Sequence, residues 1–136
     1  MRLSIAVAAF LGLACQAATP AAPAGDTGES TVRVKAGATV PADGGALHIT
    51  FERLVNDSRC PADVQCITAG DAVVALRFKG VGAGETHAEL HTSPRSAQQT
   101  EYGPYVIRLD ALEPYPRSDR ETKPSEYVAV LNVTRS

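Results

Sequence analysis

The chain is 136 residues long, with 44% apolar, 21% charged and 5% aromatic residues and a formal net charge of −2. This length is typical of one small globular domain. Its 13 basic and 15 acidic residues form no basic cluster, which argues against nucleic acid as a partner.

The first 14 residues have the features of a bacterial export signal. Arg2 supplies a positive start, and the run Leu3–Ala14 is apolar except for Ser4 and Gly12. This run is too short to anchor the chain as a membrane-spanning helix. The segment Leu11–Cys15 resembles the lipobox of bacterial lipoproteins, in which cleavage before the cysteine leaves a lipid-modified N terminus.

This resemblance implies that residues 1–14 are a signal peptide and that Cys15 carries a lipid anchor in the membrane. The alternative is ordinary cleavage near Ala17 or Ala24, which would release a soluble exported protein. Gln16 stands where many lipoproteins of the inner membrane have aspartate. We therefore expect the cell envelope, at the outer membrane facing the periplasm or the exterior, or else a periplasmic or secreted protein.

Residues 15–30 predict a disordered tether. The stretch Gln16–Ser30 consists mostly of Pro, Ala, Gly, Ser and Thr and contains no large aliphatic or aromatic side chain. A single β-domain is expected over residues 31–136, which is long enough for one modest hydrophobic core.

Alternating apolar and polar residues predict strands in six parts of this domain. The runs are Val32–Val34, Leu47–Phe51, Ala72–Phe78, Thr86–Thr92, Tyr105–Leu109 and Tyr127–Val133. Clusters of Gly, Pro, Asn and Asp separate them, as turns separate antiparallel strands. The expected fold is all-β, an antiparallel sandwich or partly open barrel of six to seven strands. A short helical turn is expected at most at Pro61–Gln65 or Ser93–Thr100.

Cys60 and Cys66 remain as a pair once Cys15 is lipidated or removed. An oxidising compartment favours a disulfide between them. Zinc is the alternative, but this spacing is unusual for zinc sites and no nearby histidine completes a ligand set. We predict one short disulfide loop.

The segment around these cysteines is the most distinctive part of the chain. It reads Asp57-Ser58-Arg59-Cys60-Pro61, followed by Cys66, Gly70 and the predicted strand from Ala72. This pattern resembles a family of small exported bacterial proteins, often lipoproteins, with the motif D-S-R-C-P-x4-C. The resemblance implies an exported, disulfide-bearing, mostly β protein and no particular activity. Relatives often carry tryptophan where this chain has Thr68, so ring stacking at that position is not expected.

The residue types of this motif suggest a structural clamp. Asp57 and Ser58 are suited to hydrogen bonds with backbone N–H groups one or two residues ahead. Pro61 fixes its own φ and restricts the loop.

Arg59 carries five donors that suit a carboxylate or several carbonyl groups at once. The candidate carboxylates are Asp57, Asp63 and Asp71. We favour the clamp; the alternative is a recognition surface that presents Arg59 to an anionic partner.

Histidines on the predicted strands are the remaining candidates for metal binding. His87 and His91 flank Glu89 on one strand face, about 13 Å apart along the strand, which is too far to share one zinc ion. His48 is a possible cross-strand partner. We predict no metal site and keep these three histidines only as weak candidates.

No pattern for nucleophilic catalysis is present. There is no G-x-S-x-G motif, and Ser58 has no histidine nearby in the sequence. The acids around the cysteine pair are expected to be partners of Arg53 and Arg59 rather than a paired-carboxylate site. They are Glu52, Asp57, Asp63 and Asp71.

These patterns together predict a non-enzymatic domain of the cell envelope, without a cofactor, that binds an unknown ligand or envelope protein or serves as a structural accessory. Tyr115, between two prolines, is the aromatic side chain most suited to be exposed and to contact a partner, but packing on the sheet edge is the role that we favour for it. Two alternatives stay open. One is an inhibitor-like module that presents the Cys60–Cys66 loop to an exported hydrolase; the other is a metal-handling or hydrolytic domain.

Overall fold

The computed structural model describes residues 28–136. The predicted signal peptide, Cys15 and most of the predicted tether lie outside these residues. Within residues 28–136, no helix is long and apolar enough to cross a membrane.

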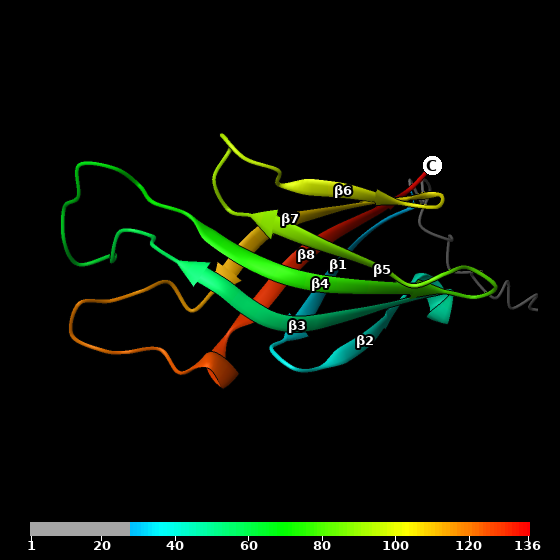
Figure 1. Ribbon diagram of the computed structural model, residues 1–136, viewed down its shortest axis with the longest axis horizontal. Helices are drawn as coiled ribbons and strands as arrows, with labels where there is room; N and C mark the ends of the chain where they lie inside the picture. The colour runs from blue at the N-terminus through cyan, green and yellow to red at the C-terminus, as the bar shows by residue number, and fades with distance from the viewer. Residues whose placement is uncertain (1–27) are drawn as a thin grey trace, which may run out of the picture.

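Eight strands form two antiparallel four-stranded sheets that pack face to face (Figure 1). One sheet has the order β1-β8-β7-β6 and the other β2-β3-β4-β5. The strands are β1 (Glu29–Lys35), β2 (Thr39–Ala42), β3 (Leu47–Asp57), β4 (Ala72–Gly80), β5 (Thr86–His91), β6 (Gln99–Tyr102), β7 (Tyr105–Glu113) and β8 (Val128–Arg135). Two short 3-10 helices, η1 (Asp43–Gly45) and η2 (Pro124–Glu126), lie between strands.

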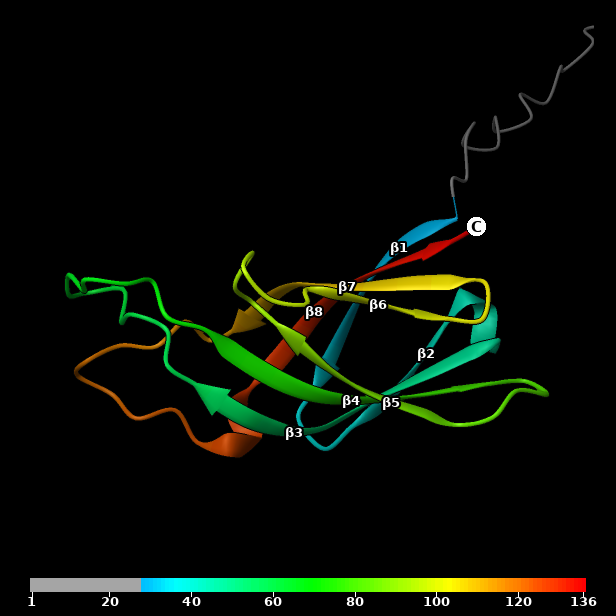
Figure 2. The ribbon, with the colours of Figure 1, turned by 45° about the horizontal axis from the view of Figure 1, so that its top comes forward.

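The chain passes between the two sheets twice. It leaves β1, runs through β2 to β5 as consecutive neighbours, and returns for β6 to β8, where β8 pairs with β1. Both ends of the described chain therefore meet, and the Arg135 N–H donates to the Gly28 carbonyl at 3.0 Å. Figure 2 shows this end of the sandwich opposite the β3–β4 and β7–β8 loops.

The core lies between the sheets and follows the period of two along each strand. In β3 the side chains of Leu47, Ile49 and Phe51 are fully buried, and the residues between them face outward. The run from Ala72 to Leu76 is buried at every position, so both faces of β4 are covered there.

The all-β prediction is confirmed, and each of the six predicted runs forms a strand. The sandwich has eight strands rather than six or seven, because β2 and β6 have only four residues each and too little alternation to be predicted. Strand β1 begins at Glu29, inside the predicted tether.

No helix forms in either of the two segments where the sequence allowed at most a short helical turn. Pro61–Gln65 contains an irregular turn, and Ser93–Thr100 contains another turn followed by the first residues of β6. Each turn is closed by one hydrogen bond between residues three apart, from the Val64 N–H to the Pro61 carbonyl at 3.3 Å and from the Ser96 N–H to the Ser93 carbonyl at 3.1 Å.

Tyr102 at the end of β6 ties the two sheets together at the end opposite the long loops. Its hydroxyl accepts from the Gly80 N–H at 2.7 Å and donates to the Gly84 carbonyl at 2.6 Å. Its ring packs 5.9 Å from that of Phe78, centroid to centroid. A residue of one sheet thus holds the β4–β5 turn of the other.

Candidate functional site

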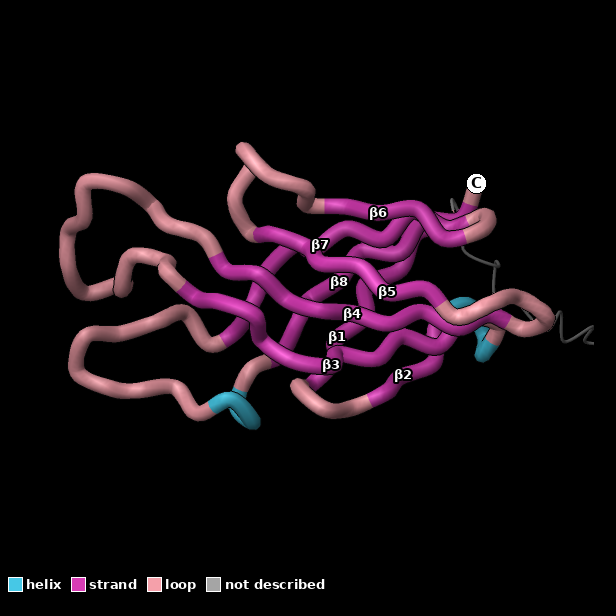
Figure 3. Tube along the Cα trace, in the orientation of Figure 1, coloured by secondary structure: helices cyan, strands magenta, loops and turns pink. Residues whose placement is uncertain are grey.

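Three loops lie at the end of the sandwich away from the chain ends (Figure 3). They are the β3–β4 loop (58–71), the β5–β6 loop (92–98) and the β7–β8 loop (114–127). The β3–β4 and β7–β8 loops each close a hairpin, and the β5–β6 loop crosses from one sheet to the other. Because these three connections lie side by side, this is where side chains distant in sequence come together.

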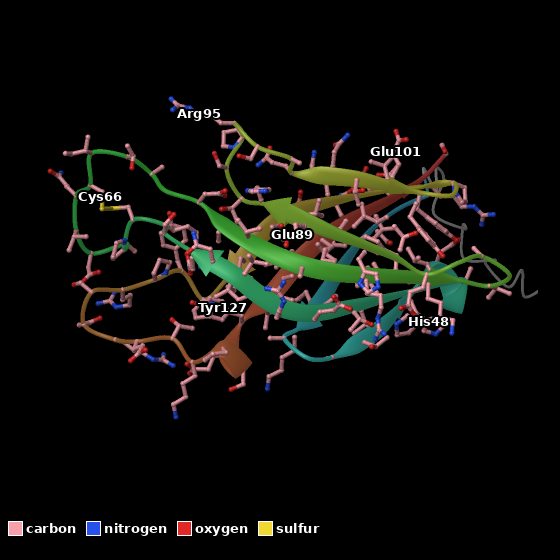
Figure 4. The ribbon with its side chains drawn as sticks, in the orientation of Figure 1. His48, Cys66, Glu89, Arg95, Glu101 and Tyr127 are labelled. Atoms are coloured by element: carbon pink, nitrogen blue, oxygen red, sulfur yellow. A yellow bond between two sulfur atoms is a disulfide. The ribbon has the colours of Figure 1, made fainter. Side chains whose placement is uncertain are left out.

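The disulfide between Cys60 and Cys66 is present, as predicted, and lies in the β3–β4 loop (Figure 4). Several hydrogen bonds attach this loop to the β7–β8 loop, among them one from the Ser118 hydroxyl to the Asp63 carboxylate. The Ala62 N–H donates to the Pro116 carbonyl at 2.9 Å, and the Ser118 N–H donates to the Asp63 carboxylate at 2.8 Å. The Ser118 hydrogen bonds hold the pKa of Asp63 below its usual value.

Arg59 joins the two sheets below these loops. Its side chain is buried, at 7% exposure for the residue, and it forms a two-pronged ion pair with Asp57 through Nε and Nη2, each at 2.8 Å. It also donates to the carbonyls of Leu112 at 2.6 Å and Pro114 at 3.1 Å. The predicted clamp is therefore what the side chain forms, and a buried Arg59 cannot be presented to an anionic partner.

The two carbonyls lie beyond the part of β7 that β6 covers: Leu112 is in β7, and Pro114 is the first residue after it. β6 pairs with β7 only from Tyr105 to Arg108, and the last contact is the Leu109 N–H to the Gln98 carbonyl at 2.8 Å. Carbonyls two residues apart in an extended chain point to the same side. Arg59, which belongs to the other sheet's loop, thus takes the place of a neighbouring strand.

Asp57 holds the guanidinium in place and is itself held by Tyr127. Its Oδ1 accepts from the Arg59 N–H at 3.2 Å, which is the predicted turn two residues ahead, and its Oδ2 accepts from the Tyr127 hydroxyl at 3.1 Å. Burial raises the pKa of Asp57, but the hydrogen bonds and positive charge of Arg59 outweigh burial and lower it below its usual value.

Ser58 does not make the predicted local turn. Its hydroxyl donates to the Asp71 carbonyl at 2.9 Å and accepts from the Asp71 N–H at 3.1 Å, 13 residues away. The start and the end of the β3–β4 loop lie side by side, so the nearest free backbone groups belong to the returning chain. Pro61 begins the turn of the loop, and its carbonyl accepts from the Val64 N–H at 3.3 Å.

The Asp71 carboxylate connects the β3–β4 loop to the β5–β6 loop. It contacts His91 Nδ1 at 2.6 Å and accepts from the Ser93 N–H at 2.9 Å and the Thr92 hydroxyl at 3.2 Å. Burial alone raises the pKa of Asp71, yet the bonds to these three residues lower it. Asp71 was predicted as a partner of Arg59; it holds His91 instead because Arg59 is already bound by Asp57.

Gly70 allows the two ends of the β3–β4 loop to approach. Its φ is +71°, and a Cβ at this position would overlap the Ser58 carbonyl oxygen and lie 2.6 Å from the Ser58 carbonyl carbon and 2.9 Å from Arg59 Cα. The conformation and the close contact both require glycine.

A groove of about 670 Å³ opens between these loops, and we call it the loop-end groove. Its walls are residues 67–70 of the β3–β4 loop and residues 92–95 of the β5–β6 loop, and Arg59, residues 110–112 and Tyr115 complete it. The Ile67 side chain is fully exposed, at 105%, and Tyr115 is 52% exposed with its ring 4.9 Å from the Arg59 guanidinium carbon. The exposure expected for Tyr115 is thus present.

The candidate histidines do not come together. His87 lies beside Glu52, His91 bonds Asp71, and His48 lies opposite Lys79 in the β3–β4 pairing. Among residues 28–136, no group of three or more His, Cys, Asp and Glu side chains is arranged to hold a metal ion. The metal-handling alternative therefore has no support in this part of the chain.

The acids near the disulfide are also separate. Asp57 binds Arg59 as predicted, but Glu52 lies beside Arg77 and His87, and Asp63 and Asp71 bind the partners given above. Arg53 forms no ion pair among the described residues.

The sequence analysis did not name Ile67 and Arg95, which are exposed, line the loop-end groove and come from different loops. One feature of the sequence could have pointed to Ile67: it is an apolar residue in a polar loop, directly after a disulfide cysteine. The sequence contained no signal for Arg95, because its place beside the β3–β4 loop depends on how the β5–β6 connection crosses between the two sheets.

Comparison of the chain with protein-family models, curated proteins and solved structures finds no match. The function is therefore argued from the geometry of the loops and the groove.

Replacing Gly70 by alanine should lower the free energy of unfolding by about 3 kcal/mol or more, because the added Cβ meets backbone as well as an unfavourable φ. Gly82 is the matched control, since its φ is also +71° but a Cβ there meets nothing within 4 Å. Gly82→Ala should cost about 1 kcal/mol. Urea unfolding of both variants measures the difference, and equal losses would contradict the close approach at Gly70.

Removing the Arg59 side chain should lower the free energy of unfolding by about 3 kcal/mol, because a buried carboxylate and two carbonyls lose their partner. Arg59→Lys should show a smaller but clear loss, since an ammonium group cannot reproduce the planar fork. The exposed Arg53→Ala is the control and should change stability by about 0.5 kcal/mol at most. Urea unfolding with the disulfide intact measures all three. If Arg59→Ala lowers the free energy of unfolding by no more than the control does, the structural role of Arg59 as a clamp is contradicted.

Asp57 should make the fold sensitive to acid. Because its folded-state pKa is lowered, its charged form adds stability above the unfolded-state pKa of about 3.9, and this is lost as the pH falls through the folded-state value. Asp57→Asn should be less stable at neutral pH but lose less stability between pH 6 and about pH 2. Glu101→Gln, on an exposed residue of β6, serves as the control and should follow the wild-type curve. Parallel curves for wild type and Asp57→Asn, measured by urea unfolding at each pH, would contradict this role.

Proposed function

We propose that this chain is an exported, non-enzymatic binding domain of the bacterial cell envelope that recognises its partner with the loop-end groove. The observation that carries the proposal is that the fully exposed Ile67 and the half-exposed Tyr115 line the same groove, on loops that are tied together by a disulfide and hydrogen bonds. Solvent-exposed apolar side chains on a rigid frame are typical of recognition surfaces.

The disulfide indicates an oxidising compartment outside the cytoplasm. The lipobox resemblance supports the further proposal of a lipid anchor at Cys15. Strand β1 begins at the end of the sandwich opposite the three loops (Figure 2). A chain anchored before β1 would therefore present the loop-end groove away from the membrane.

An inhibitor-like role is the second candidate, because the β3–β4 loop is held by the disulfide and by the β7–β8 loop while its tip is exposed. Val64 is 43% and Ile67 105% exposed. The buried Arg59 is not available for such contact, so an inhibitory segment would lie between Val64 and Ile67. Inhibition of a purified exported protease that is lost on reduction of the disulfide would favour this role.

A photo-reactive residue in place of Ile67 should form a covalent adduct with an envelope component in cells that express the chain. Val81 is the matched control, since it is an exposed aliphatic residue (82%) in the β4–β5 turn at the other end of the sandwich. The mass of the adduct identifies its protein, glycan or lipid nature. Equal adducts at both positions, or none at Ile67, would contradict binding through the loops.

Replacing Cys15 by serine should move the protein from the membrane fraction to the soluble fraction, because the predicted lipid attachment is lost. Intact mass of the wild-type protein should show the diacylglyceryl group. A wild-type protein that is soluble and has no added lipid mass would leave ordinary cleavage as the correct prediction.

A further inference from the structure

The polar side chains of the loop-end groove are mostly engaged by the protein itself. Arg59 uses four of its five N–H groups on Asp57 and two carbonyls. Asp110 accepts from Arg108 Nε at 2.7 Å, and the Thr92 hydroxyl accepts from the Ala72 N–H at 2.9 Å. A glycan or nucleotide needs many free donors and acceptors, since each polar group left without a partner weakens binding. The groove therefore offers such ligands little.

Apart from the Thr68 and Tyr115 hydroxyls and the Arg95 guanidinium, the side chains that remain free in the groove are apolar or small. Ile67 projects from one wall, Pro94 lies on the opposite wall, and Tyr115 has one ring face over the Arg59 guanidinium. The side chains of Ala69 and Ala111 between them are short, so an extended main chain has room to lie close to the groove. The lining thus suits one or two apolar side chains on an extended backbone.

Arg95 adds one positive charge at the rim. It projects from the tip of the β5–β6 loop (Figure 4), and within residues 28–136 it forms no ion pair. The backbone N–H of Arg95 donates to the Ser93 hydroxyl at 3.3 Å. This hydrogen bond restrains the loop and leaves the Arg95 guanidinium available to a ligand. Guanidinium groups bind carboxylates with two parallel hydrogen bonds.

We propose that the loop-end groove binds an extended peptide segment of another protein, in which an apolar side chain lies next to a carboxylate. The apolar side chain packs between Ile67 and Tyr115, and the carboxylate pairs with Arg95. This inference rests on the proposed binding function and names its ligand. The volume of about 670 Å³ lies within the range of pockets that enclose small ligands. The disulfide, Gly70 and Asp71 hold the walls before binding, which lowers the entropy cost of association.

The test is selection from a phage-displayed library of random linear peptides on the purified full chain. Enriched peptides should share an aliphatic or aromatic residue beside Asp or Glu. Synthetic peptides are then titrated by fluorescence anisotropy against wild type and three exposed-residue variants. Ile67→Ser should weaken binding about tenfold or more and Arg95→Gln about threefold, whereas Val81→Ser, at the other end of the sandwich, should leave it unchanged.

A paired substitution isolates the charge contact. The amide version of the peptide has Gln or Asn in place of its acid and therefore cannot form the ion pair with Arg95. It should bind wild type and Arg95→Gln equally, because the substitution then removes no further interaction. Urea unfolding of Ile67→Ser and Arg95→Gln confirms that both variants keep the fold.

The peptide proposal is overturned if no peptide is enriched over the Ile67→Ser variant, or if enriched peptides bind that variant as tightly as wild type. This outcome is separate from a failure of the binding function. An adduct at position 67 in cells, together with failed peptide selection, would leave the groove as a binding site for a folded surface, a glycan or a lipid, and the mass of the adduct would identify which. If neither an adduct at position 67 nor an enriched peptide is found, the proposed binding function is contradicted as well.

Discussion

The ion pair between Arg59 and Asp57 is the interaction on which the loop end of this domain depends. Removing a guanidinium from water is costly, and burial is stable only when nearly all its donors are bound. Here Asp57 is the last residue of β3, while the other acceptors are the Leu112 carbonyl in β7 of the facing sheet and the Pro114 carbonyl just after it. The Arg59 side chain therefore joins the two sheets at this end of the sandwich and binds backbone carbonyls that β6 does not cover.

The β3–β4 loop is rigid because several independent constraints act on it. The disulfide closes its tip, Gly70 lets its two ends touch, and Asp71 attaches its end to the β5–β6 loop. Tyr102 holds the opposite end of the sandwich with hydrogen bonds from a side chain of one sheet to the backbone of the other. Because side-chain contacts join the two sheets at both ends of the sandwich, the backbone that carries the exposed apolar side chains of the loop-end groove is restrained.

The topology places the three loops at the end of the sandwich opposite the two ends of the described chain. Because β1 and β8 pair, the two ends of the described chain lie together, and the three long loops lie at the far end (Figures 1 and 2). The anchor proposed before β1 would place the point of attachment at the opposite end from the surface proposed for binding. Anchoring and recognition can then coexist in a domain of this size without competing for the same face.

The sequence by itself determined the local features. Period-two alternation marked six strands, the cysteine pair marked the disulfide, and the fork of donors on Arg59 suggested a clamp. These follow from properties of neighbouring residues. Only the tertiary structure decided that Arg59 reaches Leu112 and Pro114, that Asp71 holds His91, and that Ile67 and Arg95 share one groove. Those contacts depend on how two sheets and three loops pack, and no short sequence pattern encodes the relative position of elements that meet only through the core.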